Sequence, residues 1–193
     1  MNFENEITVE VTLKFDQLKK LLEKYNFKIM EEYELDDIYM VPRMIDRKQD
    51  ALTVLKSCVL IRHIISKEDE KKMITYKYKE FNENKDIVKQ GKINCNIDSI
   101  DDVVALFKRL AFEELIHLND KSIVFSNGED ELVVQEVNGK HIYIEIEDKC
   151  HFIDRTYKDI EEMQQVIKKY NIPMKDNNYF VKKAEIEMLE TMK

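Results

Sequence analysis

The stretch ITVEVTLKF, residues 7–15, is the clearest strand signal in the chain, because it alternates apolar and polar residues over its whole length. On an extended strand, successive side chains point to opposite faces, so the five apolar residues would share one face. The other face would carry Thr8, Glu10, Thr12 and Lys14. A second stretch, IYIEIE at residues 142–147, repeats the pattern and places Glu145 and Glu147 on one face. Carboxylates two apart on one strand face repel each other, so they need water, basic groups or a cation between them.

The composition indicates one globular domain spanning residues 1–193. The chain has only three Gly and two Pro, so no linker divides it. A net charge of −8 disfavours non-specific binding to nucleic acid or to an acidic membrane surface. The N-terminus lacks the form of a signal peptide, and three scattered Cys residues fit a reducing compartment. We therefore expect a cytoplasmic protein.

Strand patterns outnumber helix patterns and predict an α+β fold. The predicted strands span residues 7–15, 32–41, 59–66, 73–80, 89–97, 114–119, 121–126, 132–137 and 140–148. The predicted helices span residues 16–25, 100–110, 157–170 and 180–192. The Asn-Gly pairs at 127–128 and 138–139, and the charged run 67–72, each mark a hairpin between strands. We therefore expect an antiparallel sheet.

Charged side chains gather on the polar faces of the predicted strands. The basic ones are Lys14, Arg62, Lys77 and Lys79, and the acidic ones are Glu10, Glu145 and Glu147. An antiparallel barrel or tunnel that turned these groups inward would hold a polyphosphate on the basic groups and a divalent cation, Mg²⁺ or Mn²⁺, on the carboxylates. The alternative is a solvated sheet face, where alternating Lys and Glu residues are common.

The order of several short motifs points to one family. The motifs are Glu10-Val11-Thr12-Leu13-Lys14, Asp37-Ile38-Tyr39, Val59-Leu60-Ile61-Arg62, Thr75-Tyr76-Lys77, Leu110-Ala111-Phe112, Glu136-Val137 and Glu145-Ile146-Glu147. With these motifs, the sequence resembles the CYTH superfamily of triphosphate tunnel metalloenzymes, which includes class IV adenylate cyclases, thiamine triphosphatases and inorganic triphosphatases. The resemblance implies an antiparallel β-barrel that forms a tunnel, with helices packed outside.

The resemblance also implies roles for individual residues. The family's opening motif is Glu-x-Glu-x-Lys, which Glu10 and Lys14 match, whereas Thr12 replaces the middle acid. The metal ligands would be Glu10, Glu145 and Glu147. The groups that bind the phosphates would be Lys14, Arg62, Lys77 and Lys79.

The departures from the family pattern cluster at functional positions. Neutral residues replace charged ones at Leu60, Asn94, Asn96 and Gln135. In the second half of the chain, residues 120–125 keep a tunnel-facing basic group only if the register slips by one to use Lys121. Acids and bases are lost together, so the sequence leaves open whether the ligand has changed or the site has decayed.

The first functional hypothesis is a metal-dependent hydrolase of a triphosphate-bearing small molecule, namely inorganic triphosphate, thiamine triphosphate or a nucleoside triphosphate. No catalytic residue is assigned, and cyclisation is less favoured because no adenine pocket can be identified in the sequence. One alternative is a non-catalytic or weakly active module that binds a phosphorylated ligand. Another is a structural or interaction protein with a vestigial tunnel. The sequence leaves a homodimer open.

Overall fold

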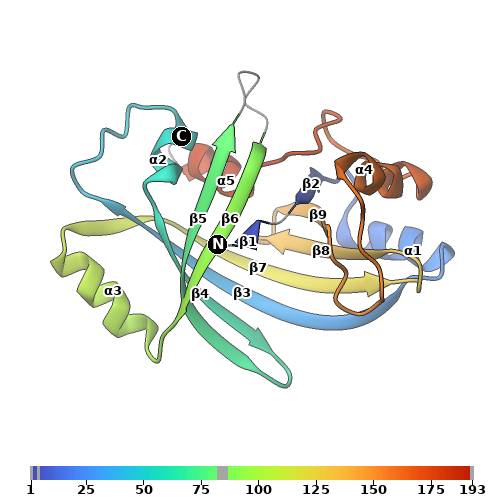
Figure 1. Ribbon diagram of the computed structural model, residues 1–193, viewed down its shortest axis with the longest axis horizontal. Helices are drawn as coiled ribbons and strands as arrows, with labels where there is room; N and C mark the ends of the chain where they lie inside the picture. Colours follow the sequence, from blue (N-terminus) through green and yellow to red (C-terminus); the bar gives the residue numbers. More distant parts are fainter. Residues whose placement is uncertain (1, 4, 82–86, 192–193) are drawn as a thin grey trace. The chain divides into compact units, whose positions relative to one another are not determined.

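The computed structural model describes residues 2–3, 5–81 and 87–191, with side chains at 5–78 and 91–191 (Figure 1). The strands are β1 (Asn2–Phe3), β2 (Glu6–Glu10), β3 (Lys28–Pro42), β4 (Val59–Ser66), β5 (Glu70–Phe81), β6 (Ile87–Asn96), β7 (Phe112–Ser126), β8 (Glu131–Val137) and β9 (His141–Glu147). The helices are α1 (Phe15–Lys24), α2 (Ala51–Lys56), α3 (Ile100–Arg109), α4 (Ile160–Lys169) and α5 (Lys183–Thr191).

The chain forms two compact units. Of the described residues, the first unit comprises 2–3, 34–81, 87–119 and 182–191, and the second comprises 5–33 and 120–181. Their boundaries fall inside β3 and β7, so each of these strands contributes residues to both units. The expectation of a single domain stays a prediction.

The strand ladders are antiparallel. In the first unit, β1 pairs with β6, β6 with β5, and β5 with β4. In the second unit, β7 pairs with β8, β8 with β9, and β9 with β2. The α+β class with an antiparallel sheet is therefore confirmed. A closed barrel is not shown, because the hydrogen-bonded order of the described strands starts at β1 and ends at β2.

Both predicted Asn-Gly hairpins are present, and their backbone explains the residue choice. Asn138 and Gly139 have φ values of 50° and 66°, and Gly128 has a φ of 87°. Asn and Gly tolerate this left-handed region better than other residues, which lets the chain reverse within a few residues. These turns fix the β7–β8 and β8–β9 registers and therefore place every side chain of β9.

The second unit buries the apolar face of its sheet against two helices. The buried strand residues include Ile7, Val9, Ile142, Ile144 and Ile146, and the helix residues that share their cluster include Leu18, Leu22, Met163, Val166 and Ile167. Each such side chain contributes about 1.5–3 kcal/mol when it leaves water. Because side chains alternate along a strand, this packing turns the acidic residues of β2 and β9 to the opposite face of the sheet.

Several element boundaries differ from the predictions. The predicted strand 7–15 is too long, since β2 ends at Glu10 and α1 begins at Phe15. The predicted strands 114–119 and 121–126 are one continuous strand, β7. Helix α2 was not predicted; the Asp50 side chain caps it by accepting a hydrogen bond from the backbone N–H of Thr53. Over the part of the chain that the structure describes, no helix is long and apolar enough to cross a membrane.

Candidate metal centre and phosphate-binding residues

The β2–β9 ladder brings three carboxylates together in the second unit. Its register sets Glu6 opposite Glu147 and Thr8 opposite Glu145. Among the described residues, the carboxylate oxygens of Glu6, Glu145 and Glu147 form the one group that could hold a metal ion, since they lie within 4.8 Å of one another. All three side chains are half-buried. The ladder therefore concentrates negative charge where solvent only partly screens it.

The chemistry of this cluster suits a divalent cation with oxygen ligands. Mg²⁺, Mn²⁺ and Ca²⁺ all bind carboxylate oxygens, and a cation between like charges relieves their repulsion. The Nε2 atom of His151 lies 3.0 Å from Oε2 of Glu147, at the rim of the cluster. An acidic cluster that could hold a metal ion is therefore present.

Glu10, a predicted metal ligand, is engaged elsewhere. It lies on the same face of β2 as Glu6, but its Oε1 atom accepts hydrogen bonds from Nζ of Lys175 and from Nδ1 of His141, each at 3.0 Å. The chain that follows α4 runs along β2 and holds Lys175 in place, because the backbone N–H of Lys175 donates to the carbonyl of Glu10 at 2.8 Å. The metal-capable cluster includes Glu6 in place of Glu10.

Lys14, a predicted phosphate ligand, lies outside β2. It occupies the N-cap position of α1, its backbone N–H donates to Oε1 of Gln17, and its side chain is exposed. The period-two pattern continues past Glu10, but the backbone has turned into the helix by Phe15. Lys14 therefore lies past the end of β2, at the start of α1.

The predicted basic residues Arg62 and Lys77 belong to the first unit. The β4–β5 register pairs Arg62 with Met73, so Arg62 shares a sheet face with Thr75 and Lys77. Both Nε and Nη2 of Arg62 donate to the carboxylate of Asp37, at 2.7 and 2.6 Å. Asp37 is only 2% exposed, so this bidentate pair fixes the guanidinium firmly.

Lys77 has a basic neighbour that the sequence did not reveal. The β5–β6 register sets Lys77 directly opposite Lys92 and Thr75 opposite Asn94, whose Oδ1 accepts a hydrogen bond from the Thr75 hydroxyl at 3.0 Å. The register therefore places two basic residues side by side on this face of the sheet. Lys79 lies opposite Gln90 in the same ladder, but its side chain lies outside the described residues.

Lys121 does not replace the basic groups that the family carries in this strand. Lys121 pairs with Glu136, whereas Ser122 pairs with Gln135, which in turn pairs with Tyr143. Lys121 is exposed and therefore points to the face opposite the buried Ser122 and Gln135 side chains. The register has not slipped, so the polar face of β7 carries a hydroxyl where the family carries a basic group.

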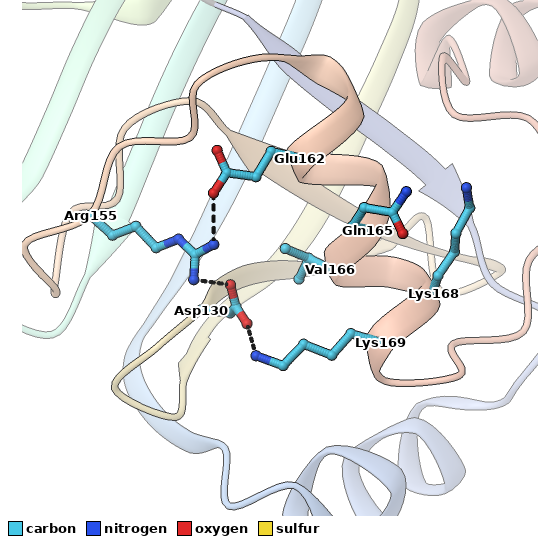
Figure 2. A pocket seen from close by; sticks show the side chains of 7 residues that line it. All are labelled: Asp130, Arg155, Glu162, Gln165, Val166, Lys168 and Lys169. Carbon is cyan, nitrogen blue, oxygen red and sulfur yellow. Dashed lines mark hydrogen bonds and ion pairs between the residues drawn. The ribbon is translucent and has the colours of Figure 1, made fainter.

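A pocket of about 390 Å³ beside α4 contains a second cluster of charges (Figure 2). At its floor, Asp130 accepts hydrogen bonds from the hydroxyls of Tyr170 and Tyr157, at 2.5 and 3.2 Å, and forms salt bridges with Arg155 and Lys169, at 2.7 and 2.9 Å. Burial alone would raise the pKa of Asp130, but Tyr170, Lys169 and Arg155 together hold it below its ordinary value. The network links the β7–β8 turn to α4, so we assign it a structural role.

Comparison with solved structures gives the class of fold. The structure is similar to that of the PH1819 protein from Pyrococcus horikoshii OT3, with a TM-score of 0.67 and 18% identity over 98% of this chain and 100% of that chain. It is also similar to the "Putative adenylyl cyclase HpAC1 from Hippeastrum", described with a dominant triphosphatase activity, with a TM-score of 0.55 and 14% identity over 91% of this chain and 90% of that chain. These likenesses show a shared fold.

One known protein is similar to this chain in sequence over nearly its whole length. The chain is 26% identical over 187 residues to the "Putative adenylate cyclase MJ0240" of Methanocaldococcus jannaschii, covering 94% of this chain and 98% of that protein. No protein-family profile matches the chain. The resemblance drawn from the sequence is confirmed, since this relative and the Hippeastrum structure both carry adenylate cyclase names.

Proposed function

We propose that this protein is a metal-dependent hydrolase of a triphosphate-bearing small molecule. The observation that carries the proposal is the cluster of Glu6, Glu145 and Glu147 on the β2–β9 ladder. Carboxylate oxygens that converge on rigid paired strands form a preorganised set of oxygen ligands for a cation, and a bound cation relieves the repulsion between like charges. The chain is also similar to a protein described with triphosphatase activity, and a cation bound here would act on the phosphates of such a substrate.

The metal would be Mg²⁺ or Mn²⁺, held by Glu6, Glu145 and Glu147. When bound, such a cation neutralises phosphate oxygens and activates water for attack on phosphorus. Each carboxylate supplies an oxygen ligand, and the ladder fixes the spacing between the ligands. His151, beside Glu147, would orient that carboxylate through its ring N–H.

The resemblance drawn from the sequence implies that basic residues would bind the phosphates. Arg62 is held in position by Asp37, and Lys77 lies opposite a second basic residue, Lys92, in the β5–β6 ladder. Lys79 remains part of this proposal, as does the closed tunnel that the resemblance implies. Lys14 is left out because it belongs to the start of α1.

Hydrolysis is preferred to cyclisation. The plant structure that shares this fold is described with a dominant triphosphatase activity, although its name is that of a cyclase. The Methanocaldococcus jannaschii relative also carries a cyclase name, so the test must measure both products. Phosphate release and cyclic nucleotide formation from ATP separate the two reactions.

The experiment measures phosphate release from inorganic triphosphate, ATP and thiamine triphosphate with Mg²⁺ or Mn²⁺. We expect Lys77→Ala to lower the apparent affinity for triphosphate roughly 10- to 100-fold, because one charged hydrogen bond is worth about 1.5–3 kcal/mol. Glu145→Gln should abolish the response to metal. Matched controls are Lys20→Ala and Glu161→Gln, which change exposed residues on α1 and α4. Equal losses in variants and controls would reject the proposed residues.

One observation favours a second candidate, a module that binds a phosphorylated ligand without turnover. Leu60 and Ser122 stand where the family carries basic groups, and they are only 2% and 1% exposed. A substrate would therefore meet fewer positive charges than in the family. If triphosphate raises the melting temperature while no phosphate is released, this second function replaces the first.

A further inference from the structure

Helix α3 in the first unit has two different faces. It lies in contact with β4 (Figure 1). Its half-buried residues are Ile100, Val103, Val104 and Phe107, whose spacing follows one side of a helix. Phe107 also makes an edge-to-face contact with Phe112, with ring centroids 5.1 Å apart. The opposite side of α3 carries four exposed residues: Asp102, Ala105, Leu106 and Arg109. We call these four residues the α3 stripe.

The α3 stripe is complementary to itself. Asp102 and Arg109 are seven residues apart, which is about two helical turns or 10.5 Å along the axis. The point midway between them falls between Ala105 and Leu106. If a second α3 ran antiparallel across this point, each Asp102 would meet an Arg109 and each Leu106 would meet an Ala105. A two-fold axis produces this arrangement twice within one contact.

The exposure of the α3 stripe agrees with an interface. The large apolar side chain of Leu106 is 52% exposed to solvent. Among the described residues, neither the Asp102 carboxylate nor the Arg109 guanidinium forms an ion pair. Antiparallel helices also place the positive N-terminal end of one beside the negative C-terminal end of the other. The charges of Asp102 and Arg109, the exposed Leu106 and the helix dipoles therefore all favour a second copy of α3 as the partner.

We infer that α3 is a homodimer contact, in which the α3 stripe of one copy packs antiparallel against that of a second copy. In this arrangement Asp102 pairs with Arg109 of the partner subunit, and Leu106 packs on Ala105 of the partner subunit. The small alanine lets the two helices approach closely around the larger leucine. The inference does not depend on the proposed hydrolase function.

The contact is small, so the dimer is weak. One helix side buries well below the roughly 800 Å² per partner of a standard interface, and we expect a dissociation constant of about 0.1 mM. The dimer should therefore form only at high protein concentration.

Sedimentation velocity of the full chain, over concentrations up to about 1 mM, tests the inference. Leu106→Glu should raise the dissociation constant at least about tenfold, because it places two carboxylates at the centre of the contact. Leu189→Glu, which changes another exposed leucine on α5, should leave the dimer unchanged. Circular dichroism checks that both variants keep the fold.

Charge reversal tests the register. Asp102→Arg or Arg109→Asp alone should weaken the dimer, since each sets like charges against each other, and the double variant should restore it. A wild-type chain that stays monomeric at about 1 mM would overturn the inference and leave the α3 stripe to a different protein. A dimer that survives Leu106→Glu, or one that the double charge reversal fails to restore, would overturn it equally.

Discussion

Replacing Glu10 by Gln distinguishes the metal ligands predicted from the sequence from those that the structure brings together. The Glu10 side chain is 10% exposed, and its partners His141 and Lys175 are 15% and 50% exposed. The half-exposed lysine pair is worth about 0–1 kcal/mol, and the bond from His141 about 1–2 kcal/mol. The change should therefore cost about 1–3 kcal/mol, which lowers the melting temperature of a chain of this size by roughly 3–10 °C.

The assay is thermal unfolding with and without about 10 mM Mg²⁺, since a ligand that binds only the folded state raises the melting temperature. We expect Glu10→Gln to melt early yet to keep the full Mg²⁺-induced rise. Glu145→Gln should show the reverse, with a nearly normal melting temperature and no rise. If Glu10→Gln melted normally and lost the rise, Glu10 would be a metal ligand and the reasoning from its contacts would be wrong.

Three further predictions follow from other contacts. Asp130→Asn should lower the free energy of unfolding by about 2–4 kcal/mol at pH 7, because two buried tyrosine hydroxyls and two cations lose their carboxylate. Because the pKa of Asp130 is lowered on folding, this difference should disappear as pH falls below about 4, which acid titration of both proteins measures. A thiol reagent at pH 8 should label exposed Cys95 quickly and Cys58 slowly, because burial raises the pKa of Cys58 to about 12. Asp37→Ala should weaken triphosphate binding by releasing Arg62, as a titration followed by calorimetry would show.

Each of these three predictions has a control and a result that would contradict it. Glu129→Gln removes an exposed partner of Lys169 and should cost under about 0.5 kcal/mol; a loss as large as that of Asp130→Asn would argue against the buried network. Cys95→Ser should remove the fast labelling phase, and a remaining fast phase would mean that a buried thiol is accessible. Unchanged triphosphate affinity in Asp37→Ala would exclude Arg62 from the phosphate site.

The sequence predicts the antiparallel sheet well because the strand signals are strong and local. Alternation in residues 142–147 and the Asn-Gly turns each depend on a few adjacent residues, and all of them lie in strands or turns of the structure. The end of β2 could not be predicted in the same way. Leu13 and Phe15 continue the alternation of the strand, but they also fit the apolar spacing of α1, and tertiary packing decides between the two.

The site is less predictable, because it depends on pairing between distant residues. Glu6 lies at the first position of β2 in a charged N-terminal run, and only its pairing with Glu147, far along the chain, makes it part of a cluster. The available signal was its spacing of two residues from Thr8 and four from Glu10, which places all three on one strand face. Lys92 was missed for the same reason, since the β5–β6 register alone sets it opposite Lys77.

The rate of phosphate release from inorganic triphosphate, measured as a function of Mg²⁺ concentration for the wild type and Glu6→Gln, tests whether the β2–β9 carboxylates hold a catalytic metal. We predict release that requires the cation, and a Mg²⁺ requirement at least about tenfold higher in Glu6→Gln, because the variant lacks one of three oxygen ligands. Release that proceeds without a divalent cation, or a Mg²⁺ dependence that Glu6→Gln leaves unchanged, would contradict a metal-dependent hydrolase centred on β2 and β9.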